Sequence, residues 1–243
     1  MFSEYFDGNI FCLNRNSRPD RWAEAQAELV LCGITRCERF PAVHDGASNG
    51  ASGCAASHRS MWRRIAVGAG SRALIFEDDF KFLTRSELTR VGYVDTQNEV
   101  RIFDSCPGQF LTERFEFLIG HVPPIWDLLY LGGGYECKPH NRVNRYVIRN
   151  AGMLCTHAYA ISREYAQRMT AHLDSGYPHE SDPIVHSGPP DSVLASLSKS
   201  LDVFSYTLSP RLFIQRPTSQ SDIDPKPPGF PWSMTDSAHE MMV

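Results

Sequence analysis

The sequence predicts an α/β protein with a mostly parallel sheet flanked by helices. Apolar runs of strand length alternate with segments of helical periodicity, in the order strand, helix, strand, helix, strand, between Ile10 and Phe76. This order is typical of a doubly wound sheet. The run Ala73–Phe76 is continuously apolar, as expected for a strand buried on both faces. The length of 243 residues suits one large α/β domain.

The first half of the chain supplies this alternation. A strand at Ile10–Leu13 leads into a polar loop, and Asp20 is expected to cap a helix that Gly33 ends. The apolar positions of that helix are Trp22, Ala25, Leu29 and Val30, with Gln26 as a weak member, which is helical spacing. The further elements expected here are a strand at Ile34–Phe40, a helix at Gly53–Val67 and the strand at Ala73–Phe76.

The second half is expected to add strands and helices to the same domain. Ser162 is a good candidate to cap a helix that runs to Leu173. The other predicted elements are a helix at Leu111–Ile119, strands at Trp126–Leu131 and Met153–Ile161, a loop from Asp174 to Pro190, a helix at Ser192–Leu201, and strands within Val203–Ile214 that break at Pro210. We expect a single domain over residues 1–223 and a proline-rich C-terminal tail over residues 224–243.

Composition restricts the classes of function. The net charge of −4 excludes a protein that binds nucleic acid through its overall charge. The seven cysteines are scattered, and no two pairs stand at zinc-finger spacing, so we expect reduced, mostly buried thiols. No signal-peptide pattern opens the chain, and no apolar run approaches the length of a membrane span. These features predict a cytoplasmic protein.

The acidic sequence Glu77-Asp78-Asp79 is the strongest functional feature. It directly follows the apolar strand at Ala73–Phe76, and ligands of open α/β sheets bind outside the carboxyl ends of the strands. Hard divalent cations bind carboxylate oxygens and often share them with substrate phosphates. The cluster therefore predicts a metal site, with a solvated acidic turn as the alternative.

Two further groups are candidates for binding an anionic ligand. Ser57 and His58 lie one turn into a helix whose N-terminus favours anions, although such a histidine is often a packing residue. Asn14, Arg18 and Arg21 follow the first strand, where arginine side chains are suited to hold a diphosphate. A solvated helix start explains those arginines equally well.

Asp191 is the candidate general base. It follows a long loop in Pro189-Pro190-Asp191-Ser192 and opens a predicted helix. A carboxylate in such a position can take the proton of an attacking hydroxyl. A plain N-cap is the alternative.

Taken together, these residues resemble glycosyltransferase family 25. The matching segments, in the family's order, are Phe11–Arg15 with Arg18 and Arg21, Ala42–Gly46, Gly53-Cys54 with Ser57-His58, Ala73–Asp79, Trp126–Gly132, Thr156 with Ala158–Ser162, and Gln215 with Ser221–Ile223. The sequence departs from the family pattern at Ala51-Ser52, and His44 is inserted before Asp45-Gly46.

The resemblance implies a GT-A type, Rossmann-like fold, a UDP-sugar donor carrying glucose or galactose, Mn²⁺ (or Mg²⁺), and inversion at the anomeric carbon. By position in the motifs, Asp79 and Glu77 are the expected metal ligands and Asp191 is the expected base. The residues expected at the donor are Asn14, Arg18, Arg21, Asp45, Ser57, His58, Glu77 and Asp78.

The acceptor is open at this stage. A glycan, lipooligosaccharide or hydroxylated protein is expected from the resemblance. An acid-free basic stretch containing Lys138, His140, Arg142, Arg145 and Arg149 also suits phosphates, so the alternative acceptor is a hydroxymethylated pyrimidine in DNA. A third possibility is a non-catalytic binding module that keeps only the fold.

Overall fold

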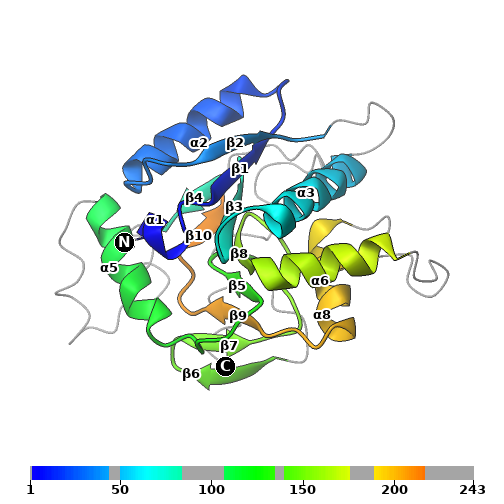
Figure 1. The fold of residues 1–243 in the computed structure, drawn as a ribbon. Coiled ribbons are helices and arrows are strands. Elements are labelled where there is room, and N and C mark those ends of the chain that lie inside the picture. Colours follow the sequence, from blue (N-terminus) through cyan, green and yellow to red (C-terminus); the bar gives the residue numbers. More distant parts are fainter. Residues whose placement is uncertain (1, 44–49, 84–106, 135–139, 176–188, 217–243) are drawn as a thin grey trace.

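The computed structural model describes residues 2–43, 50–83, 107–134, 140–175 and 189–216. In this part of the chain, a central eight-stranded sheet lies between two layers of helices (Figure 1). The predicted α/β fold class is confirmed. Asp45, Lys138, the tail over residues 224–243 and most of the loop expected between Asp174 and Pro190 lie outside the described residues.

The strands of the sheet lie in the order β2-β1-β3-β8-β5-β9-β7-β6. Pairs β1–β2, β1–β3 and β5–β9 are parallel, and β8 and β7 run against their neighbours. Six of the eight strands therefore point the same way. Their bounds are β1 Ile10–Asn14, β2 Glu38–Pro41, β3 Arg72–Glu77, β5 Leu128–Tyr130, β6 Asn141–Asn144, β7 Val147–Arg149, β8 Ala158–Ser162 and β9 Ser205–Leu208.

The reversed direction of β8 matters for the site. Because β8 is antiparallel to β3, with Ala158 opposite Phe76, the chain enters β8 at the edge where β3 ends. The backbone N–H of Glu77 donates to the carbonyl oxygen of His157 across this junction, 3.1 Å away. The segment before β8 is thus placed beside the acidic cluster that follows β3.

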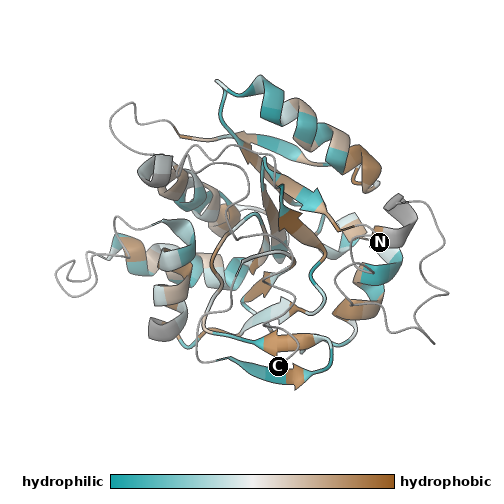
Figure 2. Cartoon of the chain, turned by 180° about the vertical axis from the view of Figure 1, so that it is seen from behind, coloured by the Kyte–Doolittle hydropathy of each residue, from teal (hydrophilic) through white to brown (hydrophobic). Residues whose placement is uncertain are grey.

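Alternating residues of the central strands feed two hydrophobic cores, one on each face of the sheet. In β3, Leu74 and Phe76 belong to the first core and Ala73 and Ile75 to the second. This period of two is the normal alternation of a strand, and it explains why the run reads as continuously apolar. Figure 2 shows the hydrophobic colour concentrated in the central strands and mixed with hydrophilic colour on the surrounding helices.

Each core is closed by its own helices. The first core takes buried residues from α1 (Phe2–Tyr5), α2 (Pro19–Leu31) and α5 (Pro107–Ile119). The second core takes them from α3 (Gly50–Val67), α6 (Arg163–Asp174) and α8 (Pro190–Ser200). None of the helices in the described ranges is long and apolar enough to cross a membrane.

Helix α2 differs from the prediction in its start and in its buried face. Asp20 was expected to cap it, but Arg18 is the N-cap residue, without a side-chain hydrogen bond. Pro19 explains the difference, because its fixed φ and missing N–H suit the first helical position. The buried residues are Arg21, Ala25 and Leu29, whereas Val30 is 78% exposed. This rotation turns Arg21 toward the interior.

Among the other predicted boundaries, the largest difference is at β8, which begins at Ala158 rather than at Met153. Ser162 caps α6 as predicted, since its hydroxyl accepts from the backbone N–H of Tyr165, 3.1 Å away. Strand β2 begins only at Glu38 rather than at Ile34. The expected break at Pro210 is present between β9 and β10 (Phe213–Gln215), and β10 pairs with β4 (Phe80–Phe82) in a separate two-stranded sheet.

Gly152 gives a test of how the loop between β7 and β8 packs against α8. Gly152 has φ +118°, and an ideal Cβ there would lie 2.7 Å from Cα of Ala195. Because both strain and overlap result, Gly152→Ala is expected to lower the free energy of unfolding by about 2–4 kcal/mol in denaturant titrations.

Gly8→Ala is the matched control for this prediction. Gly8 has φ +73° but no atom within 4 Å of an ideal Cβ, so only backbone strain of about 1 kcal/mol is expected. Equal losses in the two variants would contradict the close packing of Gly152 against α8.

Candidate active site

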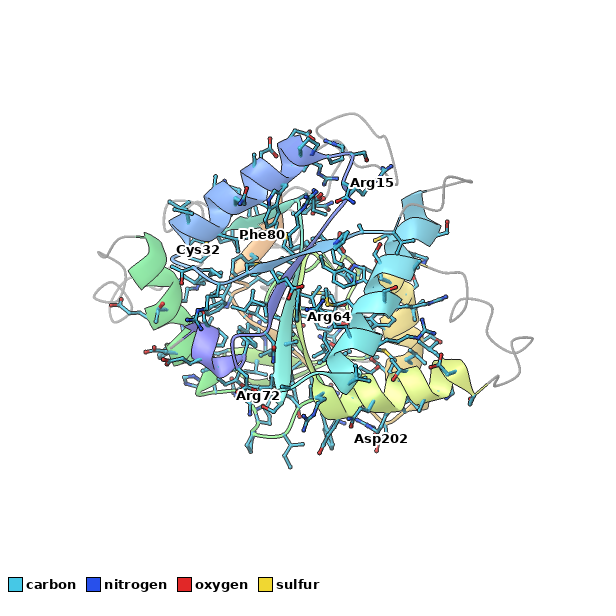
Figure 3. All side chains as sticks on the ribbon, turned by 45° about the horizontal axis from the view of Figure 1, so that its top comes forward. Arg15, Cys32, Arg64, Arg72, Phe80 and Asp202 are labelled. Atoms are coloured by element: carbon cyan, nitrogen blue, oxygen red, sulfur yellow. The ribbon has the colours of Figure 1, made fainter. Side chains whose placement is uncertain are left out.

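The candidate site lies where the strand order reverses. Strand β1 has β2 on one side and β3 on the other, so the chain leaves β1 in one direction for β2 and crosses in the other direction for β3. The carboxyl ends of β1 and β3 flank this switch point, which is where open α/β sheets bind ligands. Asn14 ends β1 and Glu77 ends β3. Figure 3 shows Arg15, just beyond β1, and Arg72, at the start of β3, at opposite ends of these parallel strands.

Arg21 holds the second and third carboxylates of the acidic cluster. Its Nη2 lies 2.8 Å from Oδ2 of Asp79, and its Nε lies 3.1 Å from Oδ1 of Asp78. All three side chains are at most one-tenth exposed. The guanidinium thus compensates two carboxylates that would otherwise repel each other in a place with little solvent.

Asn14 and Gln215 complete the support of these two carboxylates. Asn14 Nδ2 donates to Oδ2 of Asp78 at 2.6 Å, and Gln215 Nε2 donates to Oδ2 of Asp79 at 2.9 Å. The amide oxygen of Asn14 in turn accepts from Arg39 Nε and Nη2, at 2.9 and 2.6 Å. Strands β1, β2, β3 and β10 therefore each contribute to holding the acidic edge.

Asp79 keeps one oxygen available. Its Oδ1 is buried and has no hydrogen-bond partner among the described residues. Burial raises the pKa of Asp79 to about 6, with Glu77 adding to the rise and Arg21 opposing it. A buried carboxylate oxygen that lacks a donor fits the oxygen-rich coordination of Mn²⁺ or Mg²⁺. The donor chemistry at this edge therefore suits the expected cation.

Glu77 is oriented from the opposite side of the cluster. Its Oε1 accepts a short hydrogen bond from the Thr156 hydroxyl. His58 Nε2 lies 3.3 Å from the same oxygen, within ion-pair range but without hydrogen-bond geometry. Partial burial raises the pKa of Glu77, and the contacts with His58 and Thr156 outweigh this effect, so the pKa lies below its ordinary value.

His58 belongs to a buried polar chain behind Glu77. The Tyr159 hydroxyl accepts from Trp62 Nε1 at 2.8 Å and lies 2.8 Å from His58 Nδ1. The Tyr159 hydroxyl can donate to or accept from His58 Nδ1, so either imidazole tautomer keeps this contact and leaves Nε2 facing Glu77. His58 is therefore joined to the site, but through Glu77 rather than from an open surface.

Ser57 and Arg18 serve locally in this structure. The Ser57 hydroxyl donates to the carbonyl oxygen of Gly53 at 2.6 Å and accepts from the backbone N–H of Val43 at 2.8 Å, so it ties the loop after β2 to α3. Arg18 forms an ion pair with exposed Asp20 at 2.9 Å. Its carbonyl oxygen also accepts from Asn14, which fixes the turn between β1 and α2.

Asp191 is connected to the same edge by the segment before β8. Its Oδ2 accepts from the backbone N–H of Cys155 at 3.0 Å, and its Oδ1 accepts from that of Ser192 at 2.7 Å. Thr156, the next residue, contacts Glu77, so consecutive residues of this segment contact the two carboxylates. The plain N-cap alternative is wrong, since Pro189 is the N-cap residue of α8.

The basic stretch lies at the other side of the sheet. His140, Arg142, Arg145 and Arg149 are exposed on or beside the β6–β7 hairpin. The guanidinium of Arg149 stacks on Phe204 and that of Arg145 on Tyr146. Strands β8, β5 and β9 separate this hairpin from β3, so the described part of the patch is not continuous with the acidic edge.

Several residues at the site carried no expected role. Thr156, Tyr159 and Gln215 lie inside segments that resemble the family, which is a usable signal. Arg39 gives none, because its contact with Asn14 joins residues 25 positions apart. His157, beside Thr156, is fully buried, and burial lowers its pKa to about 4, so it adds no charge at neutral pH.

The raised pKa of Asp79 predicts a pH-dependent gain in stability for Asp79→Asn. The folded pKa of about 6 exceeds the unfolded value of about 3.9, so the folded state binds the proton more tightly and loses stability as the pH rises between these values. Asparagine avoids this loss and still accepts from Arg21. We expect a gain of about 2–3 kcal/mol at about pH 7.5 and none near pH 4, measured by thermal unfolding without divalent cations.

Asp20→Asn is the control for removal of a carboxylate. The hydrogen bonds from Arg18 lower the pKa of exposed Asp20 to about 2, so this variant is expected to gain nothing at neutral pH. An Asp79→Asn protein less stable than the wild type at about pH 7.5 would show that the Arg21 pair outweighs the burial of Asp79.

Comparison with known proteins identifies the family of this chain. The sequence model of glycosyltransferase family 25, described as an LPS biosynthesis protein, matches residues 39–185, which is more than half of the 243-residue chain. The match includes the acidic cluster and the hydrogen-bonded side chains of His58, Trp62 and Tyr159. No curated protein matches the chain with significance. The chain belongs to glycosyltransferase family 25 and is a glycosyltransferase, which implies a nucleotide-sugar donor and a glycan acceptor.

Proposed function

We propose that this glycosyltransferase has the GT-A arrangement and moves glucose or galactose from a UDP-sugar to a hydroxyl group, with inversion and with Mn²⁺ or Mg²⁺. The observation that carries the proposal is the buried carboxylate pair Asp78 and Asp79 at the switch point, with one oxygen of Asp79 lacking a donor. A cation at this edge would offset negative charge on the leaving diphosphate.

The chain's own residues would hold that cation and the donor. Asp79 Oδ1 and the carboxylate of Glu77 are the proposed ligands, and Thr156 fixes the orientation of Glu77. Asp78, held by Asn14 and Arg21, is proposed to face the nucleotide. Arg18 and Asp45 are kept as donor-binding proposals from their place in the family motifs.

Ser57 and His58 receive a revised role in this proposal. The Ser57 hydroxyl hydrogen is engaged by Gly53, and His58 is fully buried behind Glu77. We propose that they position the loop after β2 and the carboxylate of Glu77, respectively, rather than contact the donor. The orientation of a ligand carboxylate by such outer partners strengthens metal binding.

Asp191 is proposed as the base. In a single displacement, the acceptor oxygen forms a bond to the anomeric carbon while the bond from that carbon to the diphosphate oxygen breaks. UDP leaves with the electron pair, and the hydroxyl proton passes to the carboxylate. Asp191 accepts hydrogen bonds from two backbone N–H groups. These bonds fix the orientation of its carboxylate and leave other lone pairs of the carboxylate oxygens for the proton.

A glycan, a lipooligosaccharide or a hydroxylated protein is the favoured acceptor in this proposal. Transfer to a hydroxymethylated pyrimidine in DNA is less favoured, because the exposed arginines of the β6–β7 hairpin are separated from the acidic edge. Salt-dependent gel shift with duplex DNA tests that alternative. The non-catalytic alternative is opposed by the complete set of carboxylates at the site.

Asp79→Asn is expected to abolish turnover. Loss of the charged ligand removes metal-linked stabilisation of the leaving group, so kcat should fall by about 100-fold or more. UDP release from a panel of UDP-sugars with Mn²⁺ measures this, and isothermal titration with UDP should show weaker Mn²⁺-dependent binding. Wild-type turnover in the folded variant would remove Asp79 from the metal site.

Asp191→Asn is expected to separate chemistry from donor binding. Without the base, kcat should fall by about 10²–10⁴-fold, while Mn²⁺-dependent UDP binding stays near the wild-type value. Asp174→Asn, at a surface pair with Arg63, is the control and should keep both. Parallel loss of turnover and UDP binding in Asp191→Asn would indicate that the residue only supports the segment before β8.

A further inference from the structure

Cys54, His58 and Glu77 form a cluster of mixed donor atoms beside the acidic edge. Cys54 and His58 are four residues apart on α3, which places them on one face of the helix. That face meets the end of β3, and the three ligand atoms, one from each side chain, lie within 4.8 Å of one another. Scattered cysteines gave no zinc pattern in the sequence, because the third donor comes from a different element.

We propose that these three side chains form a binding site for a thiophilic divalent cation, with Zn²⁺ as the best match. Sulfur, imidazole nitrogen and carboxylate oxygen are its common protein ligands, and tetrahedral zinc needs pairs of ligand atoms only about 3.3–3.8 Å apart. His58 Nε2 and Glu77 Oε1 already lie at 3.3 Å. Three protein ligands leave a fourth position for water or an anion.

The state of His58 is the independent observation that supports a ligand here. His58 is fully buried, and its Nε2 makes no hydrogen bond of adequate geometry although it points at the cluster. Its other nitrogen is held by the Tyr159 hydroxyl at 2.8 Å. Metal-bound histidines commonly have their second nitrogen fixed in this way. A hydroxyl both donates and accepts, so this contact persists when the imidazole proton moves to Nδ1.

Zinc binds the thiolate form of cysteine. Formation of the zinc–sulfur bond would therefore release the thiol proton of Cys54 to solvent.

The cluster overlaps the proposed manganese site at Glu77 and differs from it in Cys54 and His58. Hard cations prefer the oxygen atoms of Glu77 and Asp79, whereas zinc prefers the thiolate of Cys54. Zinc at Cys54 would withdraw Glu77 from the diphosphate metal and inhibit transfer. That inhibition rests on the proposed function, whereas zinc binding itself does not.

Titration of the metal-free, full-length protein with Co²⁺ tests the site, since cobalt bound to a thiolate gives a near-ultraviolet charge-transfer band. We expect the band to develop at one equivalent and to be absent in Cys54→Ser. Cys155→Ser is the matched control. Burial and the carboxylates of Asp191, Glu77 and Asp79 also raise the pKa of Cys155, but this residue is outside the cluster. His58→Gln should weaken zinc binding at least tenfold in competition with a chromophoric chelator.

X-ray absorption of the zinc-loaded wild-type protein supplies a measurement that needs no variant. One sulfur at about 2.3 Å together with nitrogen and oxygen ligands is expected. A shell of nitrogen and oxygen alone, a cobalt band that survives in Cys54→Ser, or a band lost in Cys155→Ser instead would overturn the proposal. Each result is obtained with metal alone, so it stands apart from success or failure of the transferase assay.

Discussion

The confinement of three consecutive carboxyl groups at the end of one buried strand is the constraint on which this site depends. Glu77, Asp78 and Asp79 repel one another, and burial increases the cost of each charge. Arg21 compensates the last two from α2, and His58 and Thr156 hold the first from α3 and the entry to β8. Elements distant in the sequence are thus fixed around one short segment.

This arrangement leaves an electrostatic cost at the acidic edge, where a bound ligand can offset it. Asp79 retains a buried oxygen without a donor and a raised pKa, so the acidic edge is less stable with the charge present than without it. A cation bound at the proposed site would reverse that balance. Sites built for binding commonly give up stability in this way.

The sequence could predict the parts of the site that follow from local pattern. The apolar run before Glu77 predicts a buried strand, and the rule for carboxyl ends of strands then locates the site. Ser162 shows the same success for a helix cap, whereas Asp20 shows its limit, because the neighbouring Pro19 sets the start of α2. The phase of that helix, which turns Arg21 inward, depends on packing against the sheet and not on the helical period alone.

The sequence could not predict which distant segments come into contact. The antiparallel direction of β8 has no local signal, yet it brings Thr156 to Glu77, 79 positions away in the chain. Gln215 reaches Asp79 only because β10 pairs with β4. The sequence does not predict the cluster at Cys54, because its third donor, Glu77, is brought there by the packing of α3 against the end of β3. The resemblance to the family identified several of these segments but not the contacts between them.

A crystal structure with UDP and Mn²⁺, in which anomalous scattering locates the manganese, tests whether Asp79 holds the cation. We expect a manganese peak bonded to Asp79 Oδ1 and to diphosphate oxygens, at the switch point between β1 and β3. Manganese and UDP bound together at a place that does not involve Asp79 would contradict it.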